Sequence, residues 1–203
     1  MSPNQAGYQY LLAYKLTVPI YDYTVEFCNR CAYPNYPKPP DSPYSPNFPK
    51  LSSSRTFDQM VQAARSGLAN IAEGYQQKSL ASYIKLVGVS IGSLEELLKD
   101  YQAYARQHRL PIWDKSKSRE IRELGAIWAI LKSTPTLPNS PNFPHLPKSP
   151  EIAVNLMITL TNQALYLLQK LNTSLETKHT TEGGFSENLL KKRLNYRKQH
   201  PYT

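Results

Sequence analysis

Two cysteines are the first side chains of this sequence whose spacing could support chemistry. Cys28-Asn29-Arg30-Cys31 has the C-x-x-C spacing of redox and metal sites. A zinc site needs four ligands, however, and neither a second cysteine pair nor a close histidine accompanies this one. We therefore interpret Cys28 as a core residue and Cys31 as a chance neighbour, and we predict no metal site.

The histidines and acidic residues do not form a recognisable catalytic set either. The four histidines lie in linkers or polar ends, away from a plausible Ser or Cys nucleophile: His108, His145, His179 and His200. Glu95 and Glu96 diverge by about 100° on a helix, so with Asp100 they are interpreted as solvated or salt-bridging acids. No glycine-rich phosphate loop is present. The sequence predicts no catalytic residue, no cofactor and no enzyme.

Basic residues dominate the charge of the chain. Lys and Arg outnumber Asp and Glu by 24 to 15, which gives a net charge of +9. Such a balance attracts phosphate backbones, anionic lipid or acidic protein surfaces. The candidate nucleic-acid-binding residues form two groups: Arg106, Arg109, Lys115, Lys117, Arg119 and Arg122, and then Lys191, Lys192, Arg193, Arg197 and Lys198. A solvated basic face explains either group almost as well.

Apolar residues at steps of three and four predict the helices that position these groups. The expected helices cover residues of about 7–33, 56–77, 79–108, 115–132 and 150–177. Pro19 predicts a kink in the first helix. Gly88 and Gly92 lie four residues apart in the third, where we expect a neighbouring helix to pack closely against them. The fold class is therefore an all-α bundle.

Two proline-rich linkers, 34–54 and 133–150, interrupt a single helical domain over 7–178, and a basic suffix covers 179–203. Prolines occur at every third position in each linker, and both contain Ser-Pro-Asn-Phe-Pro. This spacing favours a polyproline II conformation. We interpret the linkers as semi-rigid surface spacers inserted into tolerant loops, and recognition by an aromatic-lined groove is the alternative.

The chain carries no sign of secretion or membrane insertion. Its opening residues lack a basic patch followed by an apolar run, and no stretch approaches the roughly 18 apolar residues of a membrane span. Two cysteines cannot form the disulfide framework of a secreted protein of this length. We therefore expect a cytoplasmic location and no membrane partner.

Two short motifs carry a resemblance to a known family. Asn70-Ile-Ala-Glu-Gly74 and Gly92-Ser-Leu-Glu-Glu96 resemble the bacterial four-helix-bundle family of 23S rRNA intervening-sequence proteins. The segments 21–28, 155–163 and 182–187 look like the longer subgroup with a four-helix-bundle suffix domain. The resemblance covers most of the chain except the proline-rich linkers, which depart from the family pattern.

The resemblance implies an up-and-down four-helix bundle, here with an extra short helix, that assembles into a homo-oligomer, typically a pentamer. A relative, the accessory variability determinant protein of diversity-generating retroelements, is basic, binds nucleic acid and partners a reverse transcriptase. The family motif carries over onto residues that we interpret as structural: Asn70, Glu73, Gly74, Gly92, Ser93, Glu95 and Glu96. Alternatively, Asn70 and Glu73 line a surface shared between subunits.

Two functions follow as hypotheses. The first is a non-enzymatic homo-oligomer that binds RNA or DNA electrostatically, as an accessory to a reverse transcriptase or another nucleic-acid enzyme. The alternative is a structural or protein-interaction scaffold that does not bind nucleic acid. Affinity that survives roughly several hundred millimolar salt would favour the scaffold, because phosphate contacts weaken steeply with salt.

Overall fold

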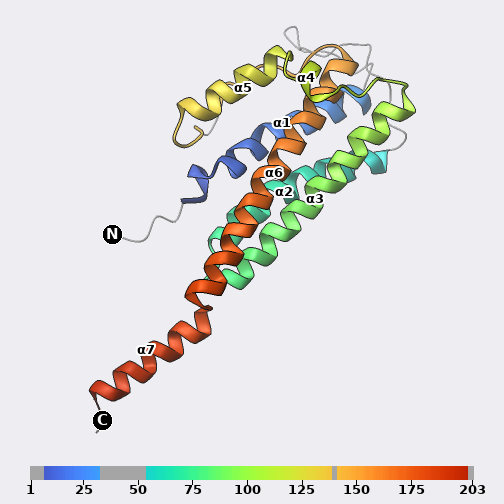
Figure 1. Ribbon diagram of the computed structural model, residues 1–203. Helices are drawn as coiled ribbons and strands as arrows, with labels where there is room; N and C mark the ends of the chain where they lie inside the picture. Colours follow the sequence, from blue (N-terminus) through green and yellow to red (C-terminus); the bar gives the residue numbers. More distant parts are fainter. Residues whose placement is uncertain (1–6, 33–53, 139–140, 201–203) are drawn as a thin grey trace.

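The computed structural model describes residues 7–32, 54–138 and 141–200, and every regular element within these ranges is helical (Figure 1). The prediction of an all-α fold is confirmed. In chain order, the elements are η1 (Gly7–Tyr10), α1 (Leu12–Ala32), α2 (Ser54–Tyr75), α3 (Leu80–Gln107), α4 (Lys115–Ser118), α5 (Arg122–Ser133), α6 (Pro150–Glu182) and α7 (Phe185–Gln199). No described helix is both long and apolar enough to cross a membrane.

Four long helices enclose the core. α1 packs against α2 and α6, α2 packs against α3, and α3 packs against α6, so each long helix has two long neighbours. Their apolar positions recur at helical spacing and are buried together. Fully buried side chains from all four helices meet there: Leu16, Phe27, Met60, Ile71, Leu94, Tyr101, Leu156 and Leu168.

The first and fourth predicted helices differ from the observed ones. The first divides into η1 and α1, and α1 continues as one helix through a buried Pro19. The single helix expected over 115–132 is wrong, because α4 ends at Ser118 and α5 begins at Arg122. Ile121 has an extended backbone between them, and its side chain is buried. The interruption between α4 and α5 therefore coincides with the burial of the Ile121 side chain.

The last predicted helix is too short. Ser149 caps it and Pro150 opens it as expected, but α6 continues to Glu182, so the domain boundary predicted at 178 falls inside the helix. Gly183 ends α6 with a φ of +80°, a left-handed conformation that glycine adopts without steric cost. The basic suffix then forms α7, which extends away from the four long helices (Figure 1).

The second proline-rich linker is not a loosely inserted spacer. Leu146 and Pro147 are buried, and α1 donates hydrogen bonds to this segment. The Tyr23 hydroxyl donates to the carbonyl of Pro144, and the Arg30 guanidinium donates to the carbonyls of Leu146 and Pro147 at 2.9 and 2.7 Å. The interpretation of residues 141–149 as a tolerant surface insertion is therefore wrong. The first linker lies outside the described residues.

Close helix packing involves other glycines than those expected. A Cβ atom at Gly67 would lie 2.6 Å from Leu94 Cδ2, and one at Gly74 would lie 2.6 Å from Tyr83 Cδ2, so these two residues let α2 approach α3. Gly88 and Gly92 are exposed, and no described atom lies within 4 Å of a Cβ atom built at either position. The prediction that a helix of the same chain packs on Gly88 and Gly92 is wrong.

Gly67→Ala and Gly88→Ala should change stability in opposite directions. At Gly67 the added methyl would lie 2.6 and 2.9 Å from Cδ2 and Cγ of the buried Leu94, and overpacking of this kind costs about 1–3 kcal/mol, against about 1 kcal/mol gained from the helix propensity of alanine. At Gly88 the methyl meets no described atom, and alanine favours the helix by about 1 kcal/mol. Urea unfolding followed by circular dichroism measures both. Equal effects of the two substitutions would contradict this assignment of the close contact.

Arg30→Ala should destabilise the fold by about 3–5 kcal/mol, because it leaves Glu26 and two buried carbonyls without their cation. Glu26→Gln, which keeps the bonds from Arg30 to the linker, should cost less. The measurement is the free energy of unfolding in urea. A loss below about 1 kcal/mol for Arg30→Ala would show that the linker does not depend on this side chain.

Candidate nucleic-acid interface and the groove between α2 and α3

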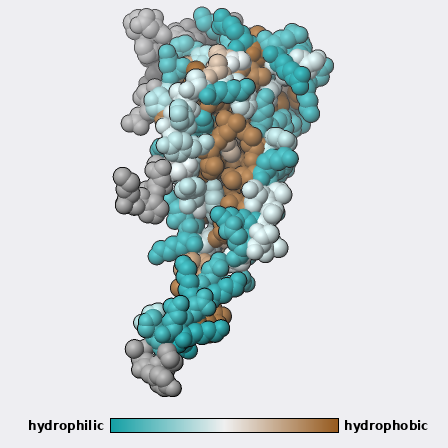
Figure 2. Space-filling model, turned by 60° about the vertical axis from the view of Figure 1, so that its left-hand side comes forward, coloured by the Kyte–Doolittle hydropathy of each residue, from teal (hydrophilic) through white to brown (hydrophobic). Residues whose placement is uncertain are grey.

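The C-terminal basic group forms an exposed surface on α7. Its five cations occur within eight residues, and every residue from Glu187 to His200 except Asn188 is exposed. None of these five side chains forms an ion pair with the described residues. Figure 2 shows mostly hydrophilic atoms over this projecting end, whereas a hydrophobic band follows one face of the body. The arrangement presents positive charge to solvent on a helix that stands clear of the body.

The second basic group surrounds the connection from α3 to α5, and all six of its side chains are exposed. Some of their charge is already engaged. Arg122 forms an ion pair with Glu123 at 3.1 Å, and the Lys117 ammonium lies over the Trp113 ring, 4.2 Å from its centroid. Phosphate would therefore compete with contacts within the chain at two of the six positions.

Arg109 has the one positive φ, +54°, among the described non-glycine residues. It follows the C-cap of α3, where the Leu110 N–H donates to the Ala105 carbonyl at 2.8 Å and the Arg109 N–H donates to Arg106. Glycine usually holds this position, because a side chain there costs roughly 1–2 kcal/mol. The residue with this strained backbone is an exposed arginine that belongs to the basic group.

The two basic groups lie at opposite ends of the molecule (Figure 1). One surrounds α4, and the other is carried by α7 beyond the far end of α6. The structure therefore collects the residues within each predicted group but does not join the groups into one surface. A short nucleic acid would contact one group or the other on a single subunit.

The family-motif residues divide between the interior and the surface. Asn70 donates to the carbonyl and the hydroxyl of Ser66 at 2.8 and 2.9 Å, and the Ser66 and Ser93 hydroxyls lie 2.8 Å apart, so this chain of bonds links α2 to α3. Gly74 is buried at the contact with Tyr83. Asn70, Ser93 and Gly74 are placed to act structurally. The other four motif residues are exposed: Glu73, Gly92, Glu95 and Glu96.

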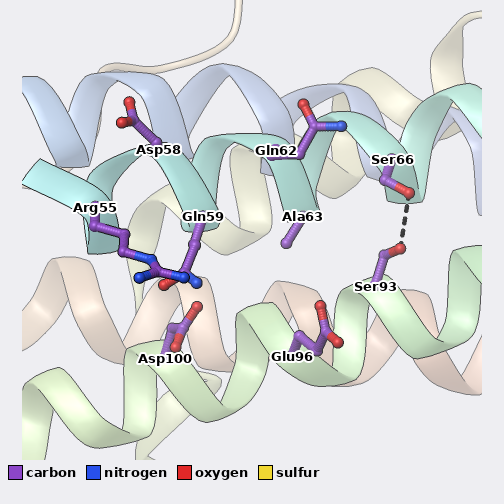
Figure 3. Close-up of a pocket in the computed structure, with 9 residues that line it drawn as sticks. All are labelled: Arg55, Asp58, Gln59, Gln62, Ala63, Ser66, Ser93, Glu96 and Asp100. Carbon is purple, nitrogen blue, oxygen red and sulfur yellow. Dashed lines mark hydrogen bonds between the residues drawn. The ribbon is translucent and has the colours of Figure 1, made fainter.

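A polar groove of about 600 Å³ runs between α2 and α3 beside this bond (Figure 3). Its walls carry three carboxylates and one guanidinium, from Asp58, Glu96, Asp100 and Arg55, and none of them forms an ion pair with the described residues. Burial and the nearby Glu96 raise the pKa of the Asp100 carboxyl above its ordinary value. The groove is a candidate site for a cationic group.

Sequence reasoning missed this groove. Asp58 and Arg55 come from the start of α2, whereas Glu96 and Asp100 come from the middle of α3, roughly forty residues later. The helical periodicity did place Glu96 and Asp100 four residues apart on one face of α3. The position of α2 opposite that face was the missing information.

Burial makes Cys28 and Cys31 poor candidates for thiol chemistry. Both side chains are fully buried, which confirms Cys28 as a core residue and replaces the interpretation of Cys31 as a chance neighbour. Burial raises the pKa of the Cys31 thiol to about 12 and raises that of Cys28 as well. Within the described ranges, no three His, Cys, Asp or Glu side chains are grouped so that they could hold a metal ion.

Both thiols should react slowly with a disulfide reagent at pH 8 while the protein is folded. The thiolate is the reactive form, and burial disfavours it at both positions. The measurement is the release of the chromophoric thiol, with guanidinium-unfolded protein as the control that should react completely. Reaction of one folded-state thiol at the unfolded rate would reopen a redox role for the C-x-x-C pair.

Comparison with known proteins does not assign the chain. No family model matches it, and no curated protein or solved structure shows a significant match. The resemblance carried by the Asn70–Gly74 and Gly92–Glu96 motifs therefore stays an expectation.

Proposed function

We propose that this chain is a non-enzymatic nucleic-acid-binding protein that attaches to RNA or DNA electrostatically through α7. In this proposal the four long helices form an up-and-down bundle and the chain works as a homo-oligomer, with the pentamer as the expectation from the family resemblance. A reverse transcriptase or another nucleic-acid enzyme is the proposed protein partner. The ring of contacts among α1, α2, α3 and α6 supports the bundle.

The charge density of α7 is the observation that carries the proposal. α7 carries five cationic side chains and one acidic side chain, Glu187, so its net charge is +4. The stretch from Lys191 to Lys198 is about 11 Å long. Duplex DNA carries one negative charge per roughly 1.7 Å of axis, so this stretch lies opposite several phosphates. Such contacts release counterions and do not read base sequence.

A protein-interaction scaffold is the second candidate, and a different observation on α7 favours it. Leu189, Leu190 and Leu194 are about half exposed on this helix. Phosphate contacts leave such side chains uncovered, whereas a protein surface would bury them. The salt dependence of binding separates the two candidates.

Replacing Lys191, Lys192 and Lys198 by Gln should weaken binding to a fluorescent RNA or DNA oligonucleotide. The slope of log affinity against log salt should fall by about 2–3 if all three lysines contact phosphate. Fluorescence anisotropy over a salt series measures both quantities. The wild-type protein should show binding at low salt that falls steeply as salt rises.

The matched control replaces Lys78, Lys85 and Lys99 by Gln, since these are also exposed lysines and their loss lowers the net charge equally. This control should keep most of the affinity and the wild-type slope. Equal losses in both variants would place binding on overall charge and remove α7 from the proposal. Absence of binding by the wild-type protein at low salt would leave the scaffold.

A further inference from the structure

α7 exposes an apolar surface that no described element covers. Phe185, Leu189, Leu190 and Leu194 are 49, 55, 56 and 48% exposed on a helix of 15 residues. An isolated helix of this length is marginally stable in water, and most helical stability in proteins comes from packing of an apolar face. α7 therefore needs a surface against which to pack.

That surface must accept positive charge as well as apolar side chains. At 100° per residue, Arg193 and Arg197 lie between the Phe185/Leu189 pair and the Leu190/Leu194 pair on the circumference of α7. Lys191 and Lys198 project from the other side of the helix. A partner that covers the apolar side therefore meets two guanidinium groups at its centre.

The groove between α2 and α3 has the complementary charge. Glu96 and Asp100 project from α3 toward α2, and Arg55 reaches between the helices from the opposite wall (Figure 3). Glu96 and Asp100 outnumber the Arg55 guanidinium, so the space between the helices carries a net negative charge. Asp58 adds a third carboxylate at the outer edge of the groove, where it points away from α3. Val89 is 43% exposed on α3, one helical turn before Ser93 of the groove, so an apolar side chain lies next to the groove on the same face of the helix.

α7 cannot reach this groove in its own chain. The turn between α2 and α3 and the end of α6 lie at the same end of the bundle, and α6 ends beyond that turn (Figure 1). Glu96 and Asp100 lie about 24 and 30 Å along α3 from Leu80. Arg193 and Arg197 lie only about 12 and 18 Å along α7 from Phe185. If α7 folded back at Gly183 along α3 of its own chain, Arg193 and Arg197 would stop short of Glu96 and Asp100.

We propose that α7 of one subunit docks into the α2–α3 groove of a second copy of this chain, with Arg193 and Arg197 opposite Glu96 and Asp100. Pairing of two α7 helices is disfavoured, because each carries a net charge of +4. The contact joins two different surfaces, so it is heterologous, and it closes into a ring or extends into a filament according to the rotation between subunits. It rests on the homo-oligomer of the proposed function. Lys191 and Lys198 remain on the outward side of the docked helix.

Charge reversal on each side of the contact tests the proposal. One variant carries Arg193→Glu and Arg197→Glu, and the other carries Glu96→Arg and Asp100→Arg. Each places like charges opposite one another, so each alone should associate at least about tenfold more weakly than the wild type. Light scattering after size-exclusion chromatography measures the mass, using nuclease-treated protein so that nucleic acid does not bridge subunits.

Two complementation experiments make the test specific. A single chain with all four reversals restores opposite charges at every contact and should recover the wild-type mass. An equimolar mixture of the two variants restores them at each contact between unlike chains, so it should associate more strongly than either variant alone, although a five-membered ring would keep one contact between like chains. Lys191→Gln with Lys198→Gln is the matched control on the outward side and should keep the wild-type mass.

Several results would overturn the proposal. One is a monomeric wild type at about 50 µM, where an interface with a Kd of about 1 µM is mostly associated. Another is wild-type mass in both reversal variants. Loss of association that neither complementation restores would also exclude this pairing. Circular dichroism and thermal unfolding establish that each variant is folded. The outcome is separable from nucleic-acid binding, since Lys191→Gln with Lys198→Gln should lower oligonucleotide affinity and leave the measured mass unchanged.

Discussion

The anchoring of the chain between α5 and α6 by side chains of α1 is the constraint on which much of the remaining structure depends. A proline-rich segment has few backbone N–H groups, so its carbonyls need donors from elsewhere. Tyr23 and Arg30 supply them to residues 144–147, and Lys15 donates to the carbonyls of Leu131 and Thr134 at 2.6 and 2.8 Å. These bonds fix where α5 ends and where α6 can begin.

The close approach of α2 and α3 shapes the groove between these two helices. Gly67 and Gly74 remove the side chains that would hold the helices apart, and the Ser90 hydroxyl donates to the Gly67 carbonyl at 2.5 Å. Farther along the same pair, larger polar side chains leave the groove that holds Glu96 and Asp100. One helix pair thus combines a tight contact with a charged opening, and the opening faces solvent.

The proposals for nucleic acid and for a second subunit use different sides of α7. A helix that docks through Arg193, Arg197 and its apolar residues still turns Lys191 and Lys198 outward. Docking would place the outward lysines of successive subunits along one assembly and would multiply the local positive potential. Association and nucleic-acid binding are therefore compatible, and variants on opposite sides of one helix separate them.

The sequence by itself determined the helical fold, the capped start of α6 at Ser149 and Pro150, and the exposed cations of α7. Each depends on spacing or residue type within one helix, which periodicity reports directly. Tertiary structure alone decided which glycines pack closely, that Arg30 is buried beside a proline-rich segment, and that Arg55 faces the same groove as Glu96. These properties depend on contacts between residues far apart in the chain, and helical periodicity carries no information about which faces meet.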